Sequence, residues 1–121
     1  MASVFEATAG LAIGYTSGSS VTQDTNKATG VTINAAAGAI TMDDAALAAG
    51  VEVSFAVTND KVTASDVVVV NHASGGTAGS YLVQANTLAA GSFAITVSNV
   101  SGGSLGEAIV LNFVVLKGAT S

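Results

Sequence analysis

Apolar and polar residues alternate along most of the chain beyond residue 20. In residues 51–58 and again in residues 92–98, every second residue is Val, Ile or Phe, and small or polar residues lie between them. Side chains of a β-strand point alternately to its two faces, so a period of two predicts a strand with one buried and one exposed face. These segments are therefore predicted to be strands of a sheet with one wet face.

Two other segments are apolar at nearly every position. Residues 67–70 are all valine, and residues 108–116 are apolar except for Asn112. Strands that are apolar on both faces are normally covered on both faces. The opposite sheet is expected to provide one cover, and a partner chain or the N-terminal arm the other.

Turn residues separate the predicted strands at short intervals. Turn residues follow the apolar segments at Asn59–Asp60, Gly75–Gly79 and Ser101–Ser104. We interpret the glycine pairs Gly75–Gly76 and Gly102–Gly103 as hairpin loops. The fold is predicted to be all-β, an antiparallel β-sandwich or jelly roll of about eight strands. The predicted strands are 20–25, 30–34, 38–42, 51–58, 66–71, 80–86, 92–99 and 107–116.

Two local patterns add detail to this prediction. Residues 43–49 are compatible with one helical turn, capped by Asp43 or Asp44 and ended by Gly50. The sequence Leu-Ala-Ala-Gly occurs at 47–50 and again at 88–91, and Asn71 and Asn112 are related by the same offset of 41 residues. This is a weak sign of an internal repeat.

The domain organisation is predicted from a change near residue 20. Residues 1–19 contain three glycines and end in a Ser/Gly-rich joint, which is typical of an extended arm. The remainder, 20–121, is predicted to be the sandwich domain. A first strand of the same domain is the other interpretation of this segment. If it is an arm, its apolar residues should dock on a partner: Val4, Phe5, Leu11, Ile13 and Tyr15.

Composition and charge exclude several classes of partner. The 121 residues include three Lys or Arg and eight Asp or Glu, for a net charge of −5. Nucleic acids and anionic membranes attract clustered cations, so neither is an expected partner. No basic segment precedes Lys27, and the apolar runs are too short for a membrane helix, so neither a secretory signal nor a membrane span is predicted.

Candidate catalytic and metal-binding residues are few. His72 is the only histidine and cysteine is absent, so any Ser–His–Asp group would have to combine His72 with Ser74 and Asp66, and no nucleophile-elbow motif accompanies them. The Asp43–Asp44 pair could bind Ca²⁺, but a cap or turn is the favoured interpretation because the EF-hand spacing is missing. Neither enzymatic activity nor a cofactor or metal is expected.

The remaining charged residues have simpler interpretations. Glu52 and Glu107 are expected to face solvent near strand starts, and Asp60, Lys61 and Asp66 are expected to be loop charges. Only 9% of the residues are charged, although charge is the usual protection of sheet edges against aggregation. A defined homo-oligomer would protect the edges and faces instead.

Several segments resemble small β-rich virion proteins of tailed bacteriophages, namely capsid decoration (cement) proteins and related fibre domains. The resemblance covers residues 20–118 and lies in strand and turn patterns, so it implies a fold and assigns no binding residue. The segments that carry it are Thr29–Asn34, Gly38–Met42, Val53–Asn59, Asp66–Asn71, Ala90–Phe93 and Leu111–Lys117.

This resemblance implies an oligomeric structural protein without enzymatic activity. The expected function is a phage capsid decoration protein, a homotrimer that binds the major capsid protein lattice on the capsid surface of the virion and is made in the host cytoplasm. A small stand-alone domain with an apolar arm, beginning at Met1, favours decoration over fibre use. The alternative is a tail-fibre or adhesin domain that binds a receptor or carbohydrate through loops 73–79 and 101–106.

Overall fold

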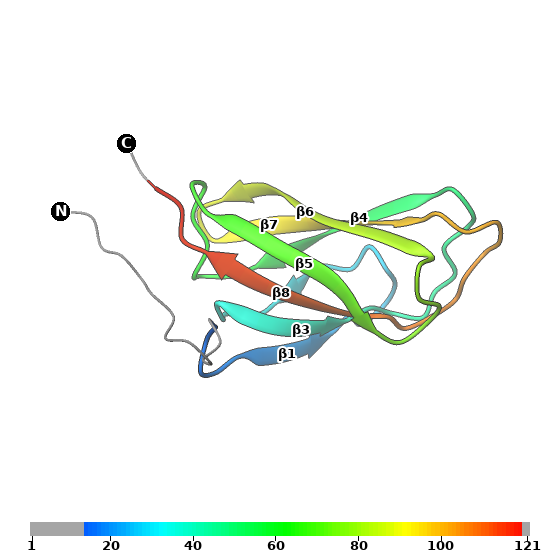
Figure 1. Ribbon diagram of the computed structural model, residues 1–121, viewed down its shortest axis with the longest axis horizontal. Coiled ribbons are helices and arrows are strands. Elements are labelled where there is room, and N and C mark those ends of the chain that lie inside the picture. The colour runs from blue at the N-terminus through cyan, green and yellow to red at the C-terminus, as the bar shows by residue number, and fades with distance from the viewer. Residues whose placement is uncertain (1–13, 120–121) are drawn as a thin grey trace, which may run out of the picture.

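The computed structural model describes residues 14–119 and contains two stacked β-sheets (Figure 1). Valine-rich alternation produces the strands, since β-branched side chains pack well on a pleated surface. The eight strands are β1 (Ser19–Thr22), β2 (Val31–Thr32), β3 (Ala37–Thr41), β4 (Glu52–Thr58), β5 (Val67–Ser74), β6 (Tyr81–Ala89), β7 (Ser92–Asn99) and β8 (Val110–Leu116).

Each sheet has four strands. Sheet A has the order β1-β3-β8-β5, and sheet B has the order β2-β4-β7-β6. The pairings β1–β3 and β2–β4 are parallel, and the other four are antiparallel. The predicted all-β sandwich is therefore confirmed, but its sheets are mixed and not purely antiparallel. The jelly-roll connection and the arm stay predictions.

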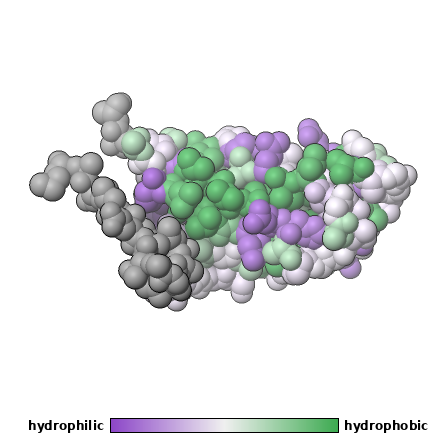
Figure 2. Space-filling view, in the orientation of Figure 1, coloured by the Kyte–Doolittle hydropathy of each residue, from purple (hydrophilic) through white to green (hydrophobic). Residues whose placement is uncertain are grey.

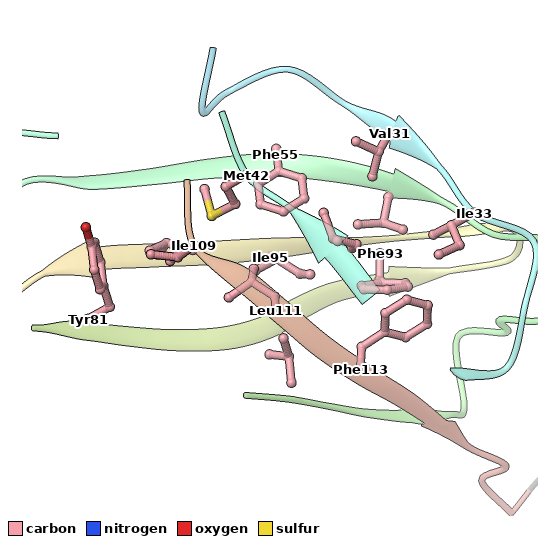
Figure 3. Packing of buried hydrophobic residues seen from close by; sticks show 14 of the residues in the cluster. Val31, Ile33, Met42, Phe55, Tyr81, Phe93, Ile95, Ile109, Leu111 and Phe113 are labelled. Carbon is pink, nitrogen blue, oxygen red and sulfur yellow. The ribbon is translucent and has the colours of Figure 1, made fainter. Parts of the chain in front are cut away.

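The hydrophobic core lies between the sheets (Figure 3). Phe93 and Phe113 come from opposite sheets, and their ring centroids are 5.7 Å apart. Ile40, Ile95, Leu111 and several other core side chains are completely inaccessible to solvent. They come from every second position of their strands, so the alternation identified the inward face.

The strands agree with the prediction in number and order, and differ at their ends. β1 ends at Thr22 and β8 begins only at Val110, whereas β5 and β6 continue to Ser74 and Ala89. The extension of β6 passes through a register shift, where Thr87 has a φ of 54°. Such a bulge adds a residue without ending the strand, so the alternation is lost there although the pairing continues.

The interpretation of both glycine pairs as hairpin loops is wrong. Gly75–Gly76 lies between β5 and β6, and Gly102–Gly103 lies between β7 and β8; in both cases the two strands belong to different sheets. Sequential neighbours pair only at β6–β7, around Gly91. Glycine allows the chain to turn, but the packing of the sheets decides which sheet the next strand joins.

The two Leu-Ala-Ala-Gly segments both lie shortly before a strand of sheet B. One directly precedes β4 and the other leads into β7, and these two strands are antiparallel partners. Gly50 and Gly91 both have positive φ, at 74° and 85°. The amide of Gly50 donates to the carbonyl of Asn99, and the amide of Asn59 donates to the carbonyl of Gly91. Both segments therefore end in a glycine turn before a strand of sheet B, but their hydrogen bonds differ.

Candidate functional site

Of the five predicted interface residues, the described part of the chain includes only Tyr15. Val4, Phe5, Leu11 and Ile13 lie outside the described residues. The Tyr15 hydroxyl donates to the backbone carbonyl of Val115 at 2.5 Å, and 47% of the residue is exposed. The pairing of β3 with β8 ends at Ala37 and Val114, so Val115 has no pairing partner in β3, and its carbonyl accepts the hydrogen bond from Tyr15 instead.

The outward-facing side of sheet A is uncharged and carries apolar and small polar side chains. Its side chains come from alternate positions of the four strands, and the neighbouring positions point into the core. We call this set the outer face of sheet A: Ser20, Thr22, Ala37, Ala39, Thr41, Val67, Val69, Asn71, Val110, Asn112, Val114 and Leu116.

Four large apolar residues gather at one end of this face, and we call them the β5–β8 patch. Val67 lies opposite Leu116, and Val69 lies opposite Val114. The exposed fractions are 56% for Val67, 44% for Val69 and 47% for Leu116. The patch forms the large green area over β5 and β8 in Figure 2.

The sequence predicted that these two strands would be covered on both faces. Sheet B covers the inner face, but no other described residue covers the patch, so its exposure is unusual for valine and leucine. A contiguous apolar area of this kind marks an interaction surface in many soluble proteins. The outer face of sheet A is therefore the strongest candidate functional site within residues 14–119.

A polar cluster lies at the opposite end of the sandwich, around Glu107. One Glu107 carboxylate oxygen accepts hydrogen bonds from the Tyr81 hydroxyl at 2.8 Å and the Thr77 amide at 3.0 Å. The other accepts from the Thr77 hydroxyl at 2.8 Å. The Tyr81 hydrogen bond is the main cause that lowers the pKa of Glu107. Burial is the main cause that raises the pKa of Tyr81 to about 12, and the hydrogen bond to the negatively charged Glu107 raises it further.

Lys27 joins this cluster through the backbone. It is only 4% exposed, and its ammonium group donates to the carbonyls of Asp43 and Glu107, the latter at 2.7 Å. Burial lowers the pKa of Lys27, while nearby acids oppose that shift. Glu107 does lie near a strand start, three residues before β8, but it is only partly exposed, and its carboxylate holds Thr77 of the β5–β6 loop instead of pointing freely to solvent.

His72 lies on β5 next to this cluster. Its Nε2 is 2.6 Å from the carbonyl of Gly75, so that nitrogen carries the proton, and its ring meets Tyr81 edge-on at 5.4 Å. Asp66 precedes the start of the same strand, about 20 Å away at strand spacing. The suggested group of His72, Ser74 and Asp66 is therefore not assembled.

Asp66 is a loop charge, as expected, since it lies just before β5, but it is buried and holds the structure together. The Asp66 side chain is 1% exposed and lies 2.6 Å from the Lys117 ammonium. It also accepts from the amides of Thr63 and Gly118. The Lys117 hydrogen bond is the largest cause that lowers the pKa of Asp66. The partners are 51 positions apart in the sequence, which hid this pair from local pattern analysis.

The Asp43–Asp44 segment forms a turn and no helix. The Asp43 carboxylate accepts a hydrogen bond from the amide of Ala45 at 2.8 Å, which is the favoured turn interpretation. Leu47, which was expected in the helical turn, instead forms a bridge with Leu105. Across residues 14–119, no three His, Cys, Asp or Glu side chains form a group that could hold a metal ion.

The same described range has no helix that is long and apolar enough to span a membrane. No protein-family model matches this chain, and neither curated proteins nor solved structures include one that is significantly similar to it.

Proposed function

We propose that this protein is a non-enzymatic structural protein that acts by surface contact, and that it works as a capsid decoration protein on the outside of a phage shell. The observation that carries the proposal is the uncharged outer face of sheet A, with the exposed β5–β8 patch at one end. The choice of a capsid as the partner rests on the resemblance of residues 20–118 to virion proteins.

The surroundings of the chemically active side chains support a structural function. His72, Glu107 and Asp66 each hydrogen-bond to groups of the same domain. Glu107 and Asp66 each accept at least three hydrogen bonds, which favour the charged carboxylate and make it a poor base. These groups hold loops in place.

Decoration would act through burial of apolar surface. Each Å² of apolar surface removed from water contributes about 25 cal/mol, so contacts repeated over many copies would resist separation of the shell subunits. In this proposal the protein forms a homo-oligomer, expected to be a trimer from the resemblance. The apolar residues of the arm, among them Phe5 and Leu11, contact the major capsid protein lattice.

Electron microscopy of virions prepared with and without this protein would test the proposal. Extra density should appear on the outside of the capsid when the protein is present. The full-length variant with Phe5→Ser and Leu11→Ser should lose that density but keep its circular dichroism spectrum, and Thr58→Ser should behave as the unaltered protein. Capsids that look the same with and without the protein would refute the proposal.

The alternative is a receptor- or carbohydrate-binding domain. A hollow next to loop 73–79 favours it, since His72, Ser74 and three glycines contribute to its lining. Tyr81 also lines the hollow but is only 7% exposed, so little of its ring is available for a sugar to stack on. Binding of the isolated protein to a polysaccharide array of host surfaces would support this alternative over decoration.

A further inference from the structure

We propose that the outer face of sheet A binds the same face of a second copy of this chain. The two copies would be related by a two-fold axis that runs parallel to the strands, between β3 and β8. This inference goes beyond the proposed function, because it assigns the outer face of sheet A to a second copy in a two-fold pair, in place of the trimer that the resemblance implies, and leaves the contact with the capsid to the arm. It rests on that function only in assuming that the protein acts by surface contact.

The first evidence is the distribution of side-chain size across the sheet. Val114 lies opposite Val69 of β5 on one side and opposite Ala37 of β3 on the other. On the far side of Ala37 lies Gly18, just before β1: a Cβ added at Gly18 would lie 2.8 Å from the Ala37 carbonyl oxygen. At this level the β5–β8 half of the sheet therefore has large side chains, and the β1–β3 half has small ones.

The next outward-facing row has the same asymmetry. Asn112 lies opposite Asn71 on β5 and opposite Ala39 on β3, and Ala39 lies opposite Ser20 on β1. Two asparagines on one half thus correspond to an alanine and a serine on the other half. The size difference extends over two consecutive rows and forms a ridge beside a shallow hollow.

The hollow is present in the shape of the molecule. It is shallow and open, and it is lined by Gly18, Ser19, Ser20, Ala37, Gly38 and Ala39 and, at its edge, by Asn112 and Phe113 of β8. The hollow lies mainly beside β1 and β3, the ridge lies on β8 and β5, and the two meet at Asn112. Rotation by 180° about a line between β3 and β8 exchanges β8 with β3 and β5 with β1. The ridge of each copy then lies over the hollow of the other.

The chemistry of the opposed residues is compatible with this arrangement. Val114 would face Ala37 of the second copy, and Asn71 would face Ser20, whose hydroxyl can exchange a hydrogen bond with an amide. No ionisable side chain belongs to the outer face of sheet A, so no charge is buried without a partner. In a two-fold dimer both copies contribute the same surface, so that surface must be complementary to itself.

The available area suggests a weak but specific contact. Strands about 4.8 Å apart that rise about 3.3 Å per residue give four strands of about six residues a plane of about 400 Å². Two such faces bury about 800 Å² in all, which is below the roughly 1,200–2,000 Å² of stable specific interfaces and in the range of weak, transient contacts. We therefore expect a reversible dimer that forms at high micromolar concentration, or on a surface that concentrates the protein.

Two matched double variants of the full chain test the pairing. In one copy, Ser20 and Asn71 are three strands apart, about 14 Å, so charges placed there interact weakly through salt solution. Across the proposed interface they are directly opposed. Sedimentation over a range of concentrations is expected to show that S20E/N71E weakens the dimer by at least about tenfold, because like charges meet. S20E/N71K should dimerise as tightly as the unaltered chain, because opposite charges meet.

The control adds the same negative charge elsewhere. T58E/Q84E places two glutamates on exposed positions of sheet B and should dimerise normally. An unaltered chain that stays monomeric up to millimolar concentration would overturn the inference, as would a dimer that S20E/N71E leaves intact or equal weakening by both pairs of charges. A trimer would also overturn the pairing but leave the decoration function standing. A dimer that never associates with capsids would refute decoration alone.

Discussion

Asn71 and Asn112 lie directly opposite each other on β5 and β8, on the outer face of sheet A. They interrupt two strands that are otherwise apolar at almost every position, and both are exposed. Their amides separate the β5–β8 patch from Val110. This pair therefore limits the continuous apolar surface that is open to a specific partner or to non-specific aggregation.

Replacing both asparagines by valine should increase aggregation without lowering folding stability. Valine is favoured in strands, and the longer apolar stripe would join copies in more than one register. Light scattering should rise at a lower protein concentration than for the unaltered chain. Asn71→Ser with Asn112→Ser is the matched control and should stay soluble. Equal scattering by the valine and serine variants would contradict the idea that this pair limits contact.

The Asp66–Lys117 pair predicts a loss of stability in acid. The pKa of Asp66 is lowered in the folded protein, so the unfolded state binds a proton first as the pH falls below about 4. The stabilisation is complete at neutral pH and disappears as the pH falls through the folded-state pKa. Urea unfolding at several pH values should show Asp66→Asn to be less stable at pH 7 and less sensitive to acid.

Asp60→Asn is the control for this experiment. Asp60 lies 3.7 Å from Lys61, and both side chains are more than half exposed, so their interaction is screened by water. Its loss should change the stability very little at any pH. If Asp60→Asn and Asp66→Asn had the same effect, the buried pair would have no special importance.

Tyr81 should ionise only in strong alkali. Its pKa is raised to about 12, by burial first and then by the hydrogen bond to Glu107. The folded state holds the proton more tightly than the unfolded state, so stability should fall as the pH rises above about 10. Ultraviolet titration of tyrosinate, with Tyr81→Phe to identify the signal, measures this pKa.

Glu107→Gln should lower the pKa of Tyr81 only partly. The substitution removes the negative charge, but burial of the ring remains and is the larger cause. The same variant should weaken the hold on Thr77 and speed hydrogen exchange of the β5–β6 loop. A pKa that stays at about 12 would mean that the carboxylate has no influence on this hydroxyl.

Gly38 is required by close packing within sheet A. A Cβ at this position would lie 2.7 Å from the Ser19 carbonyl oxygen, 2.8 Å from the Ile33 side chain and 3.2 Å from the Phe113 ring. Gly38→Ala should therefore destabilise the fold by about 1–3 kcal/mol, as overpacked cores do. Gly102→Ala, where no atom lies within 4 Å, should change stability by less than about 0.5 kcal/mol in the same thermal melts.

The limits of sequence-based inference are clear from particular residues. Glu107 was expected to face solvent and Asp66 to be a loop charge, because nothing near them in sequence suggests a partner. Lys117 lies 51 residues from Asp66, and Thr77 lies 30 residues from Glu107. For Asp66, the four valines that follow it were the only local signal of burial. For Lys27, which joins the same cluster as Glu107, no local signal pointed to it.

Alternation of apolar and polar residues was enough to predict eight strands in their order and the face that each turns to the core, because side-chain direction in a strand depends only on the neighbouring backbone. It also indicated that β5 and β8 are apolar on both faces. Sheet membership depended on long-range packing, so the two parallel pairings, the sheet-crossing glycine loops and the Asp66–Lys117 pair appear only in three dimensions. The ridge and hollow arise in the same way, because strands distant in sequence become neighbours only when the sheets pack.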